Sequence, residues 1–387
     1  MLGRQPLIGM AELERAFGDV RWFAHDAAVV SVDSFDIQRL GGTVKAGRVV
    51  MELPAHDWRK ASMKIVEHYG RAWSSAEAKI TLGISAYGFK ISPRDVQRTG
   101  LILKSQLKNS GVSLRLVPNE QAVLGTATSH HNKLGLSANK VELMVVRGHG
   151  GNVIVAESTG SQNITALAAR DQGRPARDAF VGMLPPKLAQ IIINLTGNPA
   201  SQTDDKLPVL LDPFCGTGVI LQEAMLLRYS VYGTDLSEKM IRYSRDNLNW
   251  IQEKEHLRSS WYLEEADAMD ATWRQPIDVV ACEAYLGQPF SAPPSAGKLE
   301  QVRGNCDHII SEFLKNIGKQ LQPGTPLVVA IPAWNDGHGN FTHLPLVKKL
   351  DQLGYHPIEF KNVNAKDLLY YRPEQIVARE LLVLEKI

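Results

Sequence analysis

The chain has 387 residues, of which 44% are hydrophobic and 22% charged, as is usual for a globular protein. Its formal net charge is +2, so charge neither requires nor excludes a nucleic-acid partner, and a basic site would have to be local. The three cysteines form no C-x-x-C pair, which argues against a disulfide framework and a structural zinc site, and we expect no metal. We see no signal peptide and no apolar run of the ~20 residues that span a bilayer. We therefore expect a cytoplasmic protein without a membrane segment.

Residues 1–75 have the pattern of a small α+β domain. A helix is predicted from Gly9 to Phe17, and a strand follows from Ala28 to Val32. The pattern gives no further detail in this segment.

Residues 76–165 form a second predicted α+β domain. A strand is predicted from Ile80 to Tyr87, and Ser92-Pro93 supplies an N-cap and a first-turn proline for a helix that ends near Lys108. A short strand follows at 114–117, and residues 141–147 and 153–158 are predicted to form a hairpin.

The predicted helix at 93–108 carries a basic face. Arg94, Arg98, Lys104 and Lys108 fall within roughly a third of its circumference. Such a face could follow the phosphates of an RNA. A solvated charged face without a partner is an equally good interpretation.

Residues 166–387 form the third predicted domain. It begins with a polar connector at 170–175 and a helix from Pro186 that buries an i, i+3, i+4, i+7 set of apolar residues. Strands and helices then alternate, which predicts a parallel sheet covered on both faces. The buried strands are expected at Val209–Phe214, Ser230–Asp235, Pro276–Cys282 and Pro326–Ile331. Residues 358–360 and 381–384 are expected to form an antiparallel pair at the sheet edge.

The strongest chemical signal is a glycine-containing turn after the first of these strands. The sequence is Asp212-Pro213-Phe214-Cys215-Gly216-Thr217-Gly218, where glycines let the backbone approach a ligand closely. Open α/β sheets bind ligands at this edge. Leu221 stands where a nicotinamide site would have its third glycine, whereas an S-adenosylmethionine site uses an acid such as Asp212. An ordinary strand–turn–helix is the alternative.

Two further acids follow the next strands. Asp235 ends the second strand and could accept hydrogen bonds from both ribose hydroxyls of a cofactor. Asp267 follows a third strand, which precedes the expected strand at 276–282, and could accept from an adenine amino group. Each acid alone is more often a helix cap, but their order and spacing favour the cofactor.

The next strand along the chain, expected at Pro276–Cys282, ends where amino-group methyltransferases hold their target. Such chemistry needs acceptors for the amine hydrogens and an aromatic ring that stacks on the extruded base. Glu283 offers a carboxylate, Ala284 a backbone carbonyl and Tyr285 a ring. A strand end with a buried glutamate is the alternative.

Taken together, these segments resemble the THUMP-domain tRNA guanine-N2 methyltransferases, which act on the guanosine at position ten. The resemblance covers almost the whole chain. Its N-terminal part rests on residues 2–6 and 11–14, and its THUMP part on residues 83–88 and 115–118. The entry into the catalytic domain is carried by Arg174-Pro175 and by the motif from Met183 to Ala189, and the cofactor motif by residues 212–218.

The resemblance implies an α/β protein with ferredoxin-like, THUMP and Rossmann-like class I methyltransferase domains, at 1–75, 76–165 and 166–387. It implies that the cofactor is S-adenosyl-L-methionine and the partner is tRNA or another structured RNA; some relatives also need a small activator subunit. The cofactor-binding residues would be Asp212, Phe214, Gly216, Gly218, Asp235 and Asp267.

The target motif departs from the family pattern. The Asp-Pro-Pro-Tyr of the family aligns with Glu283-Ala284-Tyr285-Leu286, so the acid is one methylene longer, both prolines are lost and the tyrosine position is a leucine. The resemblance still implies methylation of the N2 amine of a guanosine in tRNA, and the altered motif leaves other targets open. Methylation of DNA or another nucleobase, and a catalytically inactive RNA-binding homologue, are the alternatives.

Overall fold

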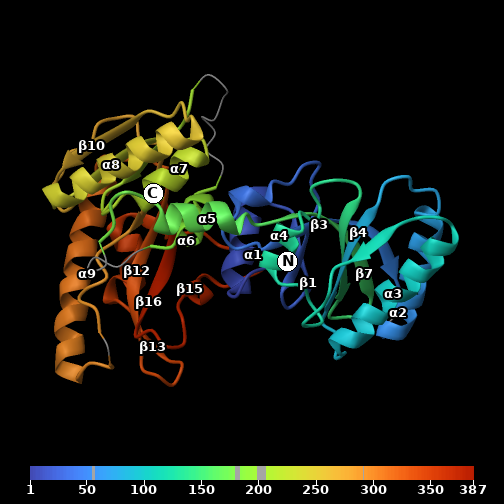
Figure 1. The fold of residues 1–387 in the computed structure, drawn as a ribbon. Coiled ribbons are helices and arrows are strands. Elements are labelled where there is room, and N and C mark those ends of the chain that lie inside the picture. The colour runs from blue at the N-terminus through green and yellow to red at the C-terminus, as the bar shows by residue number, and fades with distance from the viewer. Residues whose placement is uncertain (55–56, 179–183, 198–205, 291) are drawn as a thin grey trace. The chain divides into compact units, whose positions relative to one another are not determined.

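The computed structural model describes residues 1–54, 57–178, 184–197, 206–290 and 292–387 (Figure 1). Met183, which begins the predicted domain-entry motif, lies outside these residues. The chain forms two compact units, the first made of Met1–Pro6, Asp19–Gln38 and Thr43–Ala166, the second of Leu7–Gly18, Arg39–Gly42 and Leu167–Ile387. The predicted domain boundaries at 75 and 165 stay a prediction. Within the described ranges, no helix has both the length and the apolar character to cross a membrane.

A five-stranded sheet of order β3-β7-β6-β4-β5 is the centre of the first unit. Strand β4 is parallel to β5 and β6, and β7 is antiparallel to β6 and β3. Every residue of β4 is buried, because both sheet faces are covered. The strands are β3 (Lys45–Leu53), β4 (Ile80–Tyr87), β5 (Leu114–Leu116), β6 (Lys140–Arg147) and β7 (Val153–Ser161). The predicted strand at 80–87 is thus confirmed, and the predicted hairpin is β6–β7.

Helices α2 (Trp58–Ala72) and α3 (Pro93–Asn109) cover one face of this sheet and lie side by side (Figure 1). As predicted, α3 begins after Ser92, whose hydroxyl accepts from the Asp95 N–H while the Asp95 carboxylate accepts in return. The other face is covered by the hairpin of β1 (Val20–Ala24) and β2 (Ala27–Val30), which packs Phe23 onto β6 and β7. The predicted strand at 28–32 is the second strand of this hairpin.

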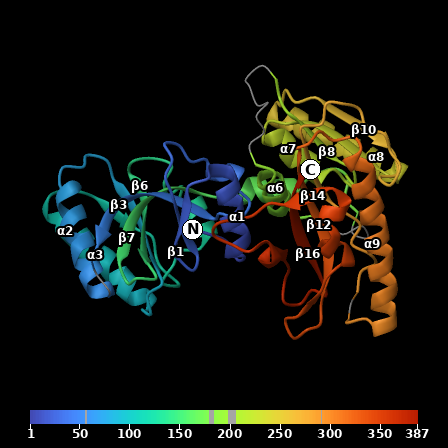
Figure 2. The same ribbon diagram turned by 180° about the vertical axis from the view of Figure 1, so that it is seen from behind.

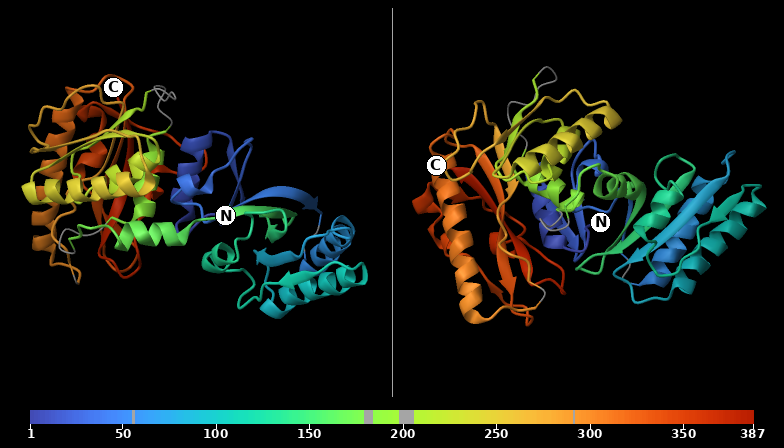
Figure 3. Two further views of the ribbon diagram at one scale, coloured as in Figure 1. Left: turned by 45° about the horizontal axis from the view of Figure 1, so that its top comes forward. Right: turned by 60° about the vertical axis from the view of Figure 1, so that its left-hand side comes forward.

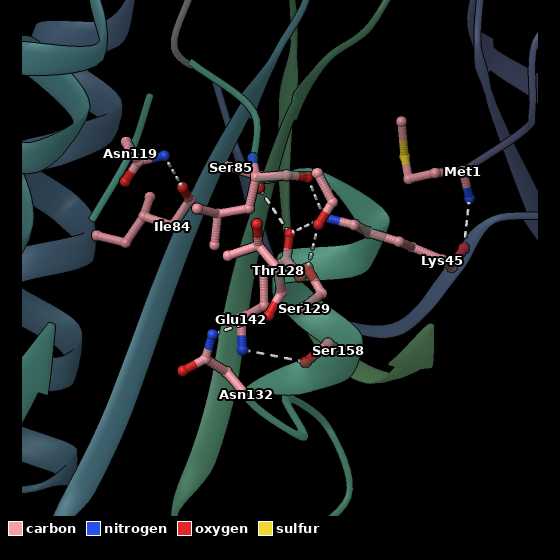
Figure 4. Close-up of polar contacts among 12 residues, drawn as sticks. Met1, Lys45, Ile84, Ser85, Asn119, Thr128, Ser129, Asn132, Glu142 and Ser158 are labelled. Carbon is pink, nitrogen blue, oxygen red and sulfur yellow. Dashed lines mark hydrogen bonds and ion pairs between the residues drawn. The ribbon is translucent and has the colours of Figure 1, made fainter. Parts of the chain in front are cut away.

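A buried ion pair lies in the first unit, between Lys45 of β3 and Glu142 of β6 (Figure 4). The hydroxyls of Ser85 and Ser129 each donate to the Glu142 carboxylate at 2.6 Å, and the Lys45 ammonium also donates to the Leu124 carbonyl at 2.7 Å. These bonds satisfy both charges away from water, as a buried pair requires. They also tie helix α4 (Thr126–His131), which carries Ser129, to the sheet.

The second unit contains a nine-stranded sheet whose main path is β10-β9-β8-β11-β12-β16-β14 (Figure 2). Neighbouring strands from β10 to β12 are parallel, and β16 is antiparallel to both of its neighbours. The strand order reverses at β8, which is where open α/β sheets bind ligands. The path strands are β8 (Val209–Asp212), β9 (Ser230–Asp235), β10 (Trp261–Glu265), β11 (Val279–Glu283), β12 (Pro326–Asn335), β14 (Tyr355–Pro357) and β16 (Val377–Lys386). Short strands β13 (Phe341–Thr342) and β15 (Leu369–Tyr370) pair with β12 and β16.

Helices cover both faces of this sheet, as predicted. On one face lie α6 (Pro186–Leu195), α7 (Val219–Leu226) and α8 (Glu238–Glu255). The long helix α9 (Ala296–Gly318) packs on the other face against Cys282 and Val329 (Figure 3). Figure 3 shows α9, in orange, running along the strands on the face opposite to α6, α7 and α8.

Two predictions for this unit were wrong in detail. The antiparallel partner of β16 is Tyr355–Pro357 rather than residues 358–360, where only the Ile358 N–H continues the pairing with Val383. The antiparallel pair does lie at the sheet edge, as predicted, with β14 as the outermost strand. The polar connector at 170–175 begins as the last turn of helix α5 (Ile164–Gln172).

Helix α1 (Pro6–Phe17) belongs mainly to the second unit. Its Glu12 is fully buried and its carboxylate accepts from the backbone N–H groups of Gly41 and Gly42 and from the Asn194 amide, each at 2.8 Å. Burial nevertheless raises the pKa of Glu12 to about 7, the three donors offsetting only part of the desolvation cost.

Candidate functional site

The glycine-containing turn after β8 has the backbone that the sequence predicted. Gly216 and Gly218 have φ of 51° and 77°, in the left-handed region that favours glycine. Gly218 is the N-cap of α7. A Cβ added to Gly218 would lie 2.9 Å from the Ser244 Oγ and 3.3 Å from the Ser244 Cα, so the position has no room for a side chain.

Helix α8 holds this turn in place through two buried polar side chains. The Ser244 hydroxyl donates to the Gly216 carbonyl at 2.8 Å, and the Asn247 amide donates to the Thr217 carbonyl at 2.8 Å. Asn247 also exchanges hydrogen bonds with both backbone groups of Ala176. Sequence reasoning missed these two residues; their only signal is that they are polar and lie three residues apart on a helix.

The acids at the ends of β8 and β9 lie beside the turn. Asp212 is 1% exposed and accepts from the Phe214 N–H at 3.1 Å. Burial raises its pKa well above the ordinary value, and the nearby Asp235 and Glu283 raise it further. Asp235 accepts from the N–H groups of Gly216 and Ser237, both at 2.9 Å, and burial raises its pKa as well.

The remaining predicted cofactor residues have different surroundings. Asp267 follows β10, is partly buried and accepts from the Met269 N–H at 2.9 Å. The ring of Phe214 packs edge-on against Phe313 of α9 at 5.1 Å, so the side chain is part of the core. Phe214 therefore offers a ligand its backbone.

The predicted target residues lie at the end of β11, beside β8. Glu283 is largely buried, and its carboxylate accepts from the guanidinium Nε of Arg379 on β16. The Ala284 N–H donates to the Ala330 carbonyl at 2.9 Å, which fixes the backbone after Glu283, and Tyr285 is 42% exposed. Sequence reasoning missed Arg379, which is far from Glu283 in the chain and carries no local signal.

The chain turns sharply after this segment. Gly287 has φ of 80°, and a Cβ there would lie 2.7 Å from the side chain of Val302 on α9. A glycine is therefore required where the segment passes against α9.

This arrangement fits S-adenosylmethionine. The cofactor carries an ammonium and a sulfonium, and the buried carboxylate of Asp212 and the partly buried one of Asp235 are complementary to cations. Acids at the ends of β9 and β10 also suit ribose hydroxyls and an adenine amine. A tight, glycine-lined turn allows close approach of the ligand to backbone groups.

Comparisons with known proteins agree with this geometry. A family model described as a methyltransferase domain matches residues 204–370. The tRNA (guanine(10)-N2)-dimethyltransferase of Methanothermobacter thermautotrophicus is 32% identical over 170 residues, 43% of this chain and 44% of that protein. A probable tRNA (guanine(10)-N2)-dimethyltransferase of Methanothermococcus thermolithotrophicus is 30% identical over 145 residues, 37% of this chain and 78% of that protein. The chain thus spans less than half the length of the first of these relatives.

Among solved structures, TrmN of Thermus thermophilus matches 99% of this chain and 97% of its own length. Its TM-score is 0.52 at 18% sequence identity. This likeness shows that the two proteins share a fold across nearly their whole length, including a Rossmann-like methyltransferase sheet.

Proposed function

Because this chain belongs to the family of tRNA (guanine(10)-N2)-dimethyltransferases, we propose that it methylates the exocyclic N2 amine of a guanosine in tRNA. The observation that carries the proposal is that Asp212, Asp235 and Glu283 end three neighbouring parallel strands at the reversal of strand order. Cofactor acids and a target acid therefore meet at one edge of the sheet.

The cofactor half of the site is assigned as follows. Asp212 binds the cofactor's ammonium, Asp235 its ribose hydroxyls and Asp267 its adenine amine. The turn from Gly216 to Gly218 lets the amino-acid end of the cofactor approach the backbone closely. When bound, S-adenosylmethionine supplies a methyl group made electrophilic by its sulfonium.

The target half holds the amine. Glu283 accepts one amine hydrogen and the Ala284 carbonyl accepts another, which directs the nitrogen lone pair towards the methyl group. Glu283 can then take the proton that the amine loses. The exposed ring of Tyr285 is available to stack on the extruded base, although it stands one position earlier than the family's tyrosine.

Two variants separate the halves of the site. Asp235→Ala should abolish both cofactor binding and methyl transfer, measured by calorimetry and with labelled S-adenosylmethionine. Glu283→Gln keeps the shape of the side chain and should leave cofactor affinity within about threefold while lowering transfer at least ~100-fold. Unchanged transfer by the Glu283 variant would remove Glu283 from the chemistry. Cofactor binding without any transfer by the unaltered chain would favour the inactive RNA-binding homologue.

We further propose that the RNA contacts the first unit through the basic face of α3. Arg94, Arg98, Lys104 and Lys108 are all exposed, and the neighbouring acid Asp95 is engaged with Ser92. Arg94→Glu with Arg98→Glu should weaken tRNA binding and reduce the slope of log affinity against log salt by about one to two. Arg258→Glu, an exposed basic position of the second unit, is the control. An unchanged slope in the α3 variant would exclude this face.

A tRNA substrate would place the protein in the cytoplasm, and the free, buried state of Cys215, Cys282 and Cys306 suits a reducing compartment. The activator subunit that the resemblance implies stays a prediction. Assays with the purified chain alone test it directly, because activity without any added protein would exclude the requirement.

A further inference from the structure

Arg379 lies beside the target acid because of the register of three strands. Glu283 of β11 pairs with Ala330 of β12, and Ala330 pairs with Leu381 of β16. Arg379 is two residues from Leu381, so its side chain leaves the same face of the sheet as that of Glu283. The opposite face carries Cys282 and Leu382 against the α9 side. The two long side chains therefore meet over β12.

The contact between them leaves each side chain with unused hydrogen-bonding capacity. The Arg379 Nε donates to the Glu283 Oε1, and within the described ranges this is the single hydrogen bond of either side chain. Arg379 and Glu283 are 12% and 16% exposed. The terminal nitrogens of the guanidinium and the Glu283 Oε2 stay available to a ligand that enters at the strand ends.

A carboxylate next to a guanidinium is complementary to one edge of guanine. That edge carries two neighbouring donors, N1–H and the N2 amine, followed by the acceptor O6. The carboxylate can accept from both donors, and the guanidinium can donate to O6. Adenine offers one donor and one acceptor on the same edge, so it makes one hydrogen bond fewer. Extruded bases are commonly read by hydrogen bonds to this edge.

The charge of Arg379 also matters for the acids around it. Glu283 lies close enough to Asp212 to raise the pKa of that carboxyl group. The guanidinium of Arg379, which is positively charged, lies against Glu283 and offsets part of this repulsion.

We propose that Arg379 is a specificity-determining residue that selects guanine by donating to O6 while it holds the Glu283 carboxylate for the amine. The inference rests on the proposed function, since it concerns the base that enters the same site. It assigns the recognition of guanine to a residue of the antiparallel strand, outside the Glu283–Leu286 segment.

The test replaces O6 without removing the amine. The target guanosine, once mapped, is exchanged for 6-thioguanosine in a ligated tRNA transcript, which keeps N1–H and the N2 amine but turns the strong acceptor into a weak one. The unaltered protein should methylate guanosine with a kcat/KM about tenfold higher than that for 6-thioguanosine, as expected for the loss of one charge-assisted hydrogen bond.

Arg379→Met should methylate guanosine more slowly and should reduce the preference to about twofold or less, with cofactor affinity unchanged. Arg379→Lys, which keeps a donor, should retain part of the preference. A full tenfold preference in Arg379→Met would overturn the inference, as would no preference in the unaltered protein. If Arg379→Met methylates neither RNA, the same ratio is read from equilibrium binding of the two RNAs. Failure of the unaltered protein on guanosine itself would instead refute the proposed function.

Discussion

Gly218→Ala tests how tightly the turn after β8 must be built. At φ of 77° an alanine costs about 1–2 kcal/mol from the left-handed backbone alone. Its Cβ would also lie 2.9 Å from the Ser244 Oγ, which is held by its bond to the Gly216 carbonyl. Moving this hydroxyl away loses that bond, about 1 kcal/mol. The total destabilisation should therefore be about 2–3 kcal/mol.

Gly324→Ala is the matched control, because Gly324 has φ of 83° and open space where a Cβ would stand. Urea unfolding should show this variant to lose about 1 kcal/mol less than Gly218→Ala. Calorimetry should show S-adenosylmethionine affinity unchanged by Gly324→Ala and lowered about tenfold by Gly218→Ala, since the displaced turn is the proposed ligand contact. Equal destabilisation and equal affinity in the two variants would refute the close approach of α8 to the turn.

Three further predictions concern buried charges. The raised pKa of Asp212 implies that the affinity for S-adenosylmethionine falls with decreasing pH at pH values above those at which ordinary carboxyl groups titrate. Asp212→Asn should bind the cofactor weakly at every pH, and a pH-independent affinity of the unaltered chain would contradict the role of Asp212 in cofactor binding. The pKa of Glu12 is about 7 in the folded protein, against an ordinary value of 4.5, so the unfolded state releases this proton first as the pH rises, and the group's contribution to stability falls by about 3 kcal/mol between pH 4.5 and 7. Urea unfolding should therefore show a flatter pH dependence of stability for Glu12→Gln than for the unaltered protein in this range, and parallel curves would exclude the raised pKa of Glu12. Lys45→Met should destabilise the first unit by about 3–5 kcal/mol, because it leaves Glu142 buried without its cation. In thermal unfolding, the double variant with Glu142→Gln should regain part of the lost stability, whereas strictly additive losses would show that the two charges do not interact.

Much of the fold could be predicted because its signals are local. Strands β8, β9, β11 and β12 are short apolar runs bounded by turn residues, and Ser92-Pro93 marks the start of α3 directly. Helix α2 was missed because its four buried apolar residues, Trp58, Ala61, Ile65 and Tyr69, are separated by charged ones in a segment of low mean hydropathy. Helix α1 is assigned to the second unit by contacts such as that between Glu12 and Asn194, which are 182 positions apart.

The candidate site likewise contains residues that local patterns predict and a partner residue that they do not. The turn at 212–218 lies within one strand–turn–helix motif and Asp235 ends the following strand, so local patterns place both. Their part in cofactor binding stays a prediction. The partner of Glu283 could not be predicted, because Arg379 is 96 positions away and reaches it through the registers of β11, β12 and β16. No sequence pattern near Glu283 indicates which residue of β16 will lie beside it.

The central claim is that this strand-end cluster transfers a methyl group to the amine of a guanosine. The most direct measurement is the incubation of the purified chain with labelled S-adenosylmethionine and unmodified total tRNA, followed by digestion and identification of the labelled nucleoside. The predicted result is N2-methylated guanosine, lost in Glu283→Gln while cofactor binding persists. Label in another nucleoside, or no label despite bound cofactor, would contradict the proposed reaction.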